Sequence, residues 1–297
     1  MRFFLCCLLL LGVVEARAAE VRVVATTGMI ADLVRRVGGE RVEVVQLMGA
    51  GVDPHLYKAT TRDAAALLRA DVIFYSGLKL EGRMTEVLAK LGGAGRAVYA
   101  VTEAMDREQL LAPAAFEGHY DPHVWFDVSL WAQTVPVMVR GLSAVDAAGA
   151  EQYARRGAEL QLELEALHAW VQAEVSQIPP KNRVLITSHD AFNYFGRAYG
   201  LRVVGLQGVS TVSEAALGDV ASLVDFIRAQ GVRAIFVEST VNPEAMRRVA
   251  KDAGVRIGGE LFSDAMGAPG EMRFGWDTGT YEGMVRANVE TVVEALK

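Results

Sequence analysis

DAAGAEQYARRGAELQLELEALHAWVQAEVSQ, residues 146–177, is the stretch that decides the fold. It contains no proline, and it ends just before Pro179-Pro180. Glutamate and arginine residues separate apolar side chains that recur at helical spacing: Tyr153, Leu160, Leu164, Leu167 and Val171. The spacing predicts one amphipathic helix of about thirty residues, long beside the globular mean of about 11–12.

Short β-branched runs alternate with amphipathic stretches on both sides of this helix. Strands are expected at Val21–Ala25, Val42–Leu47, Val72–Tyr75, Ala97–Ala100, Val184–Thr187, Arg202–Gly205, Ala234–Val237 and, more weakly, Val255–Ile257. Helices are expected at Met29–Val37, Thr61–Leu68, Met84–Leu91, Leu217–Gln230, Pro243–Ala253 and Thr280–Leu296. Such alternation is typical of β-α units on a parallel sheet.

These patterns predict an α/β protein with two Rossmann-like β-α lobes joined by a single long helix. The expected division is an N-terminal lobe at 19–143, the linking helix at 144–178 and a C-terminal lobe at 179–297. The alternative interpretation is a surface helix within one large domain, because domains can reach about 250 residues.

The first eighteen residues have the pattern of a secretory signal peptide. A basic start precedes an apolar run from Phe3 to Val14 and the small-x-small site Ala16-Arg17-Ala18. The run is about a dozen residues, whereas crossing a bilayer takes about 20. We therefore expect a signal peptide at 1–18, cleavage after Ala18 and a soluble periplasmic product. No second long apolar run follows.

Cysteine content and charge exclude several classes of function. The two cysteines, Cys6 and Cys7, lie inside the apolar run with no lipidation box before them, so a lipoprotein is not expected. Without cysteine, the mature part has no disulfide, thiolate metal site or cysteine nucleophile. The formal net charge is −6, and an acidic chain is a poor partner for nucleic acid.

Three of the five histidines share a sequence context. His55 and His123 each follow an Asp-Pro pair, and His189 directly follows the expected strand Val184–Thr187. In open α/β sheets, ligands bind beyond the carboxyl ends of the strands. Neutral imidazole is the commonest protein ligand of transition metals. Each histidine alone would suit an ordinary hydrogen-bonded position, but the three together predict a shared metal cleft.

The remaining candidates are two histidines and a fourth, carboxylate ligand. His168 lies in the long helix and is expected to be solvated, and His119 is expected at the surface, with a role as a spare ligand left open. Asp264 and Asp277 compete for the fourth position. Chemistry favours Asp264, which follows a strand, because Asp277 also suits a turn or the cap of the last helix.

Motifs of common catalytic sites are absent from the sequence. There is no His-Glu-x-x-His, Gly-x-Ser-x-Gly or Walker-type motif, and no Gly-x-Gly-x-x-Gly after the first strand. Ser188-His189-Asp190 contains the residue types of a catalytic triad, but adjacent side chains on a strand end point in different directions, whereas a triad needs them to converge.

Four segments resemble those of the metal-specific solute-binding proteins of bacterial ABC importers, the TroA-like zinc and manganese binders. The resemblance covers essentially the whole mature chain. It is carried by DPHLY at 53–57, DPHVW at 121–125, SHDAFNYFGRAYG at 188–200 and GELFSDA at 259–265. It implies that each segment supplies one metal ligand, giving His55, His123, His189 and Asp264, with the metal between the lobes. It also implies an inner-membrane ABC permease as partner.

The resemblance implies a binding protein, not an enzyme, and we expect a monomer that captures and delivers a metal. Three imidazoles and one carboxylate suit zinc, while manganese, the alternative, favours more oxygen ligands. Many zinc members carry a His-rich loop before the second histidine, and here that stretch holds only His119.

A zinc-dependent hydrolase with an open coordination position is the competing function, with Glu238 as its candidate base. A host-surface adhesin is disfavoured because no lipid anchor is expected.

Overall fold

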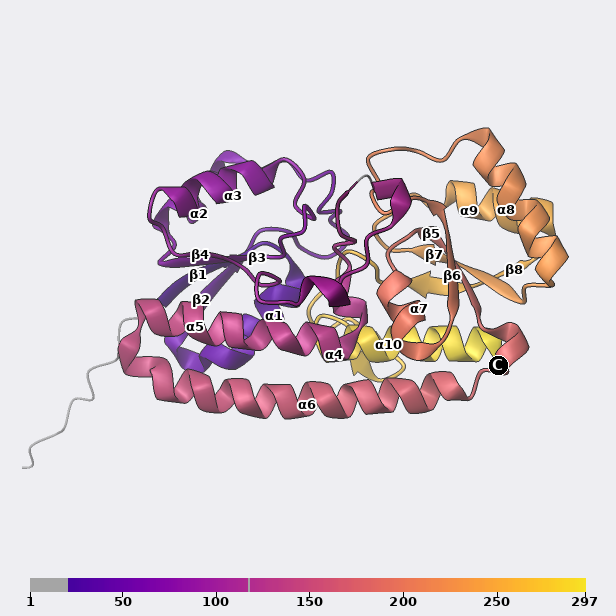
Figure 1. Cartoon of the computed structure of the whole chain (residues 1–297). Coiled ribbons are helices and arrows are strands. Elements are labelled where there is room, and N and C mark those ends of the chain that lie inside the picture. Colours follow the sequence, from indigo (N-terminus) through magenta and orange to yellow (C-terminus); the bar gives the residue numbers. More distant parts are fainter. Residues whose placement is uncertain (1–20, 117) are drawn as a thin grey trace, which may run out of the picture.

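Two α/β lobes lie side by side along one long helix in the computed structural model, which describes residues 21–116 and 118–297 (Figure 1). The long helix is α6 (Ala150–Ser176). This arrangement confirms the predicted α/β class with a linking helix. The predicted signal peptide lies outside the described residues.

The N-terminal lobe contains a four-stranded parallel sheet in the order β2-β1-β3-β4. Its strands are β1 (Val21–Ala25), β2 (Val42–Gln46), β3 (Val72–Tyr75) and β4 (Val98–Ala100). Its helices are α1 (Gly28–Gly38), α2 (Thr61–Arg69), α3 (Met84–Gly93), α4 (Val128–Trp131) and α5 (Val135–Val145). Helices α1 and α5 pack against α6, and α2 and α3 lie on the other side of the sheet (Figure 1).

The C-terminal lobe contains two parallel strand pairs that lie next to each other. These are β5 (Val184–His189) with β6 (Arg202–Gln207), and β7 (Ala234–Glu238) with β8 (Arg256–Leu261). Strands β5 and β7 are neighbours. The helices are α7 (Asn193–Tyr199), α8 (Leu217–Gln230), α9 (Glu244–Ala253) and α10 (Tyr281–Leu296). A short hairpin of β9 (Met272–Arg273) and β10 (Trp276–Asp277) precedes α10.

Short 3₁₀ helices connect several of these elements. They span Gly39–Arg41, Arg107–Gln109, Ala114–Phe116, Val124–Phe126, Ala132–Thr134, Ala147–Gly149 and Pro180–Asn182. The one at Val124–Phe126 matters most for function, because His123 stands directly before it.

Helix α6 begins at Ala150, four residues later than the pattern predicts. Asp146 has a non-helical backbone, and its carboxylate accepts hydrogen bonds from Arg41 Nε at 2.8 Å and Tyr153 Oη at 2.6 Å. These bonds fix the turn between α5 and α6, so the chain still bends at the residues where the helix is expected to begin. The five apolar side chains that predicted the helix are all buried.

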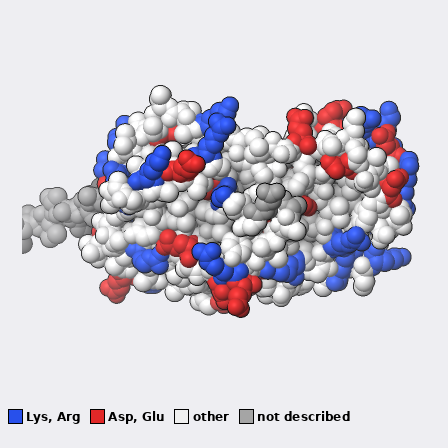
Figure 2. All heavy atoms as spheres, turned by 45° about the horizontal axis from the view of Figure 1, so that its top comes forward, with Lys and Arg blue, Asp and Glu red and all other residues white. Residues whose placement is uncertain are grey.

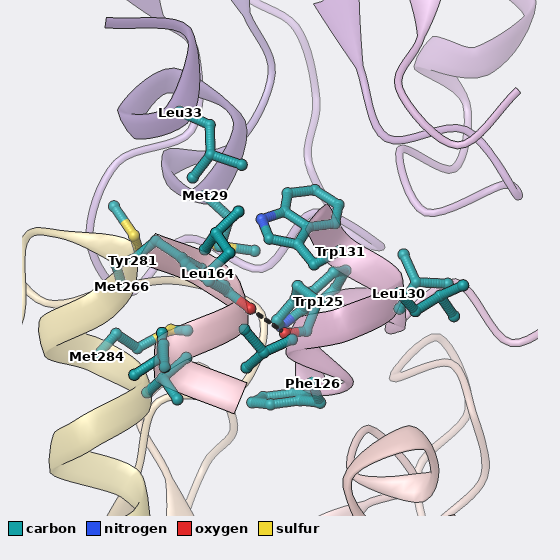
Figure 3. Close-up of a cluster of buried hydrophobic side chains, with 14 of the residues drawn as sticks. Met29, Leu33, Trp125, Phe126, Leu130, Trp131, Leu164, Met266, Tyr281 and Met284 are labelled. Carbon is teal, nitrogen blue, oxygen red and sulfur yellow. Dashed lines mark hydrogen bonds between the residues drawn. The ribbon is translucent and has the colours of Figure 1, made fainter. Parts of the chain in front are cut away.

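One continuous hydrophobic core extends through both lobes. It includes Val23 from β1 and Leu185 from β5. Figure 3 shows its centre, where side chains from α1, α4, α6 and α10 meet. There, Tyr281 Oη donates a hydrogen bond to the Trp125 carbonyl at 2.6 Å, and Trp125 Nε1 donates to the Ser263 carbonyl at 3.1 Å. Close packing and buried hydrogen bonds therefore fix how the lobes sit on the linking helix.

The described surface is that of a charged protein with both signs interspersed. Figure 2 shows Lys and Arg side chains scattered among Asp and Glu on one face, without a continuous basic area on that face. Among residues 21–116 and 118–297, no helix combines the length and apolar character needed to span a membrane.

Candidate metal centre

Four polar side chains meet between the lobes. His55 lies in the loop between β2 and α2, His123 precedes the 3₁₀ helix Val124–Phe126, His189 ends β5, and Asp264 follows β8. One ligand atom from each lies within 4.8 Å of the others. All four are buried, with 8% of His55 exposed and 1% or less of the other three. The two lobes thus contribute two residues each to one enclosed cluster.

The spacing of the ligand atoms suits a four-coordinate metal ion. Three separations are 3.3 Å: His55 Nε2 to His123 Nε2, His123 Nε2 to Asp264 Oδ1, and His189 Nε2 to Asp264 Oδ2. His55 Nε2 lies 3.8 Å from Asp264 Oδ2. A tetrahedron with zinc–ligand bonds of about 2.0–2.1 Å has edges of about 3.3 Å. Three of the four separations, which involve both oxygens of Asp264, are therefore close to the edge length of a zinc tetrahedron, and the 3.8 Å separation is longer.

The inward-facing atoms lack other partners. Among the described residues, His189 Nε2 and both carboxylate oxygens of Asp264 are buried without a hydrogen bond. Buried polar atoms in native proteins are nearly always satisfied, so orphaned ones need an explanation. A cation shared by these atoms would satisfy them, and the donor set of imidazole nitrogen and carboxylate oxygen fits a transition metal.

Buried carboxylates orient two of the imidazole rings. Asp121 Oδ1 accepts hydrogen bonds from His123 Nδ1 at 2.7 Å and from the His123 backbone N at 3.0 Å. Glu238 Oε2 accepts from His189 Nδ1 at 2.6 Å, and its Oε1 accepts from the His189 backbone N at 2.9 Å. An ionised carboxylate only accepts, so Nδ1 of each ring carries the proton. Each Nε2 is then directed into the cluster as a ligand.

The three histidines of the cluster differ in their pKa values because their charged neighbours differ. Burial lowers the pKa of His55 to about 4. Burial also opposes protonation of His123, but the carboxylates of Asp121 and Asp264 together raise its pKa to about 9. Burial opposes protonation of His189 too, yet Glu238 and Asp264 raise its pKa well above the usual value. The pKa values of His123 and His189 are therefore raised by neighbouring carboxylates, whereas burial dominates at His55.

Asp264 is held in its charged form by the same neighbours. Burial alone would raise the pKa of Asp264, but His189 and His123 hold it well below the usual range. A carboxylate that stays ionised in a buried site is a ready ligand for a cation.

Asp277, the other candidate for the carboxylate ligand, lies outside the cluster. Asp277 Oδ1 accepts hydrogen bonds from the backbone N of Gly270 at 3.0 Å and of Gly279 at 2.9 Å. Asp277 is therefore a turn residue, as its alternative interpretation held. The cap of α10 is Thr280.

The two remaining histidines also lie elsewhere. His119 Nε2 is 2.8 Å from Lys79 Nζ, and the side chain is half-buried. His168 is half-buried as well, and its Nδ1 lies 3.1 Å from Tyr199 Oη. His168 is therefore only partly solvated, because Tyr199 of α7 packs against this face of α6.

Ser188-His189-Asp190 does not converge as a catalytic triad. Asp190 Oδ1 accepts a hydrogen bond from the Gly205 backbone N at 2.9 Å, and the His189 ring bonds to Glu238 instead. The sequence analysis missed that Asp121 and Glu238 orient histidines. The repetition of Asp-Pro-His at 53–55 and 121–123 is the sequence signal that could have identified Asp121 as an orienting residue.

Comparisons with known proteins agree with the four-segment resemblance. The family model for the periplasmic zinc-uptake complex component A matches residues 23–295. The zinc-binding protein TroA of Treponema pallidum is 46% identical over 279 residues, 92% of this chain and 88% of that protein. The manganese-binding lipoprotein MntA of Bacillus subtilis is 44% identical over 283 residues, 94% of this chain and 90% of that protein.

The fold agrees as well. The structure of the periplasmic zinc-binding protein TroA from Treponema pallidum matches with a TM-score of 0.89 at 43% identity. The match covers 94% of this chain and 99% of that chain. The family match and these relatives extend over nearly the whole described protein, and so the chain belongs to the periplasmic zinc-uptake component A family.

Proposed function

We propose that this protein captures one divalent transition-metal ion outside the inner membrane and delivers it to an ABC-type importer. The ligands in this proposal are His55, His123, His189 and Asp264. The observation that carries it is the buried interlobe cluster, in which ligand atoms lie 3.3 Å apart and several have no other partner.

The cluster supports binding, not catalysis. Four protein ligands complete a tetrahedral zinc site and leave no position for an activated water. Glu238, the candidate base of the hydrolase alternative, uses both carboxylate oxygens to hold His189. Neither the site nor the family supports the hydrolase.

Zinc is the proposed cargo. Three imidazole nitrogens and one carboxylate match its preference, and the 3.3 Å spacing matches its bond lengths. The named relatives include both a zinc-binding and a manganese-binding protein, so manganese is the alternative to be measured against zinc.

The proposed mature protein is soluble, periplasmic and monomeric, with an inner-membrane ABC permease as its partner. It begins after cleavage at Ala18, and its lobes occupy 19–143 and 179–297 on either side of the linking segment 144–178. The periplasmic description of the family supports the location. The mass of the exported protein tests the cleavage site, because a lipid on a cysteine would add to it.

Calorimetric titration of chelator-stripped residues 19–297 with zinc, and then with manganese, tests the function. We expect one-to-one binding that is lost or strongly weakened in Asp264→Ala and His189→Ala. Asp277→Ala is the matched control, since Asp277 lies outside the cluster, and it should bind like the wild type. Failure of the wild type to bind either metal stoichiometrically would overturn the proposal.

A further inference from the structure

The two Asp-Pro-His segments use their aspartates in the same way. Asp53 Oδ1 accepts a hydrogen bond from the His55 backbone N at 2.8 Å, and Asp121 Oδ1 accepts from the His123 backbone N at 3.0 Å. Each aspartate thus fixes the turn that presents its histidine.

The second oxygen of each aspartate bonds to the opposite lobe. Asp53 Oδ2 accepts a hydrogen bond from Thr211 Oγ1 at 2.6 Å. Asp121 Oδ2 accepts from Asn193 Nδ2 at 3.1 Å. Thr211 and Asn193 both belong to the C-terminal lobe. Each carboxylate therefore joins a ligand-bearing turn of one lobe to the other lobe.

The junction at Asp121 is heavily reinforced. Asp121 is fully buried, and its backbone carbonyl accepts a hydrogen bond from Tyr194 Oη at 2.9 Å. Asn193 also donates to the Asp190 carbonyl at 3.1 Å and stands at the start of α7. Separating the lobes here would break both bonds to Asp121, the one from Asn193 and the one from Tyr194.

The junction at Asp53 is lighter and lies nearer the surface, because Asp53 is half-buried and Thr211 is 9% exposed, whereas Asp121 is fully buried. Thr211 belongs to the loop between β6 and α8, and its neighbour Val212 is 66% exposed. Asp53 and Thr211 both line a cavity of about 350 Å³ that opens between the lobes. Among the described residues, the Thr211 side chain makes a hydrogen bond to Asp53 alone, so this junction depends on one hydroxyl.

His55, next to this junction, is the least supported of the four proposed ligands. Carboxylates hold Nδ1 of both His123 and His189, whereas among the described residues the His55 turn is held through its backbone N. His55 also has the greatest exposure of the four and the longest separation from Asp264.

We propose that the Asp53–Thr211 hydrogen bond is a releasable latch that controls how fast the metal leaves, while the Asp121–Asn193 junction stays closed. This inference rests on the proposed function. Loss of the Thr211 bond frees the loop of the C-terminal lobe and loosens the turn that presents His55. The metal then departs through the cavity beside Asp53, and Asp53 and Thr211 act as positioning residues.

The test measures zinc dissociation from the loaded mature protein by stopped-flow mixing with excess chelator. Thr211→Val keeps the shape of the side chain but cannot donate, and one hydrogen bond to a charged group corresponds to about a tenfold or greater increase in the dissociation rate. Thr211→Ser keeps the hydroxyl and should dissociate at close to the wild-type rate. Val212→Ala, at an exposed position of the same loop, is the control for general perturbation.

The outcomes separate the latch from the proposed function. Wild-type protein that binds no zinc would overturn the function itself. If the wild type binds one zinc, equal dissociation rates for Thr211→Val and wild type would overturn the latch. So would Thr211→Ser or Val212→Ala releasing zinc as fast as Thr211→Val. Fast release in Thr211→Val alone, with unchanged stoichiometry and an unchanged association rate, is the result we expect.

Discussion

Glu238 and His189 form a two-point contact in which one carboxylate oxygen bonds to the imidazole Nδ1 at 2.6 Å and the other to the backbone N at 2.9 Å. The contact joins the ends of the neighbouring strands β5 and β7. It fixes both the position of the ligand residue and the proton on its ring. For Glu238 to act as a general base, its carboxylate would first have to break this contact with His189.

Replacing Glu238 should weaken metal binding without abolishing it. Glu238→Gln removes the negative charge that supports the basicity of His189, and loss of such an outer partner typically lowers affinity about 10–100-fold. Competition against a chelator of known affinity measures the change. Glu214→Gln, at an exposed position, is the control and should match the wild type. Unchanged affinity in Glu238→Gln would remove the orienting role.

Metal binding should release protons at neutral pH. In the metal-free protein the pKa of His123 is raised to about 9 and that of His189 is raised well above its usual value. Each of these two rings therefore carries a second proton, and a positive charge, at pH 7. The lowered pKa values leave His55 neutral and Asp264 ionised at this pH. We expect about two protons released per metal ion, because ligands must be deprotonated. Calorimetry in buffers of different ionisation enthalpy counts them.

The same shifts set the direction of the pH dependence. Because protons compete for His123 and His189 below their raised pKa values, affinity should fall steadily as the pH is lowered from 7.5 to about 5. Affinity measured by competition across this range checks the slope. A flat profile would contradict the assignment of these histidines as ligands.

Leu164 should matter far more for stability than Leu162, its neighbour on α6. Leu164 is 1% exposed and Leu162 is 66% exposed. Truncating a buried leucine to alanine leaves a cavity and costs about 2–5 kcal/mol, whereas an exposed change stays within about 0.5 kcal/mol. Denaturant unfolding of Leu164→Ala and Leu162→Ala compares them. Similar losses in both would show that α6 does not pack as described.

Much of the fold was predictable because periodicity marks buried faces. The alternation of β-branched and amphipathic stretches placed β1 and α8 with their observed bounds. Helices α4 and α5 were missed because residues 128–145 are apolar nearly all round, which conceals a helical face. Their burial between the sheet and α6 explains that composition, and Pro136 stands in the first turn of α5, where proline is tolerated.

The β9–β10 hairpin was missed for a different reason. Its two turn residues, Phe274 and Gly275, both have positive φ, 51° and 83°. Such turns favour asparagine, aspartate or glycine at the first position, so phenylalanine there hides the turn from sequence reasoning. The structure has that residue half exposed at the hairpin tip.

The candidate ligands were predictable, but the groups around them were only partly so. Strand ends and the Asp-Pro-His echo single out the three histidines, and the family resemblance decides between Asp264 and Asp277. Glu238 lies 49 residues from His189 along the chain, and only the packing of β7 beside β5 brings them together. Tertiary contacts of this kind leave no local pattern.

Anomalous diffraction at the zinc edge from crystals of the zinc-loaded mature protein tests the central claim most directly. The account predicts one peak per chain, bonded at about 2.0–2.1 Å to Nε2 of His55, His123 and His189 and to a carboxylate oxygen of Asp264. A peak at any other place, or zinc held by fewer than these four residues, would contradict it.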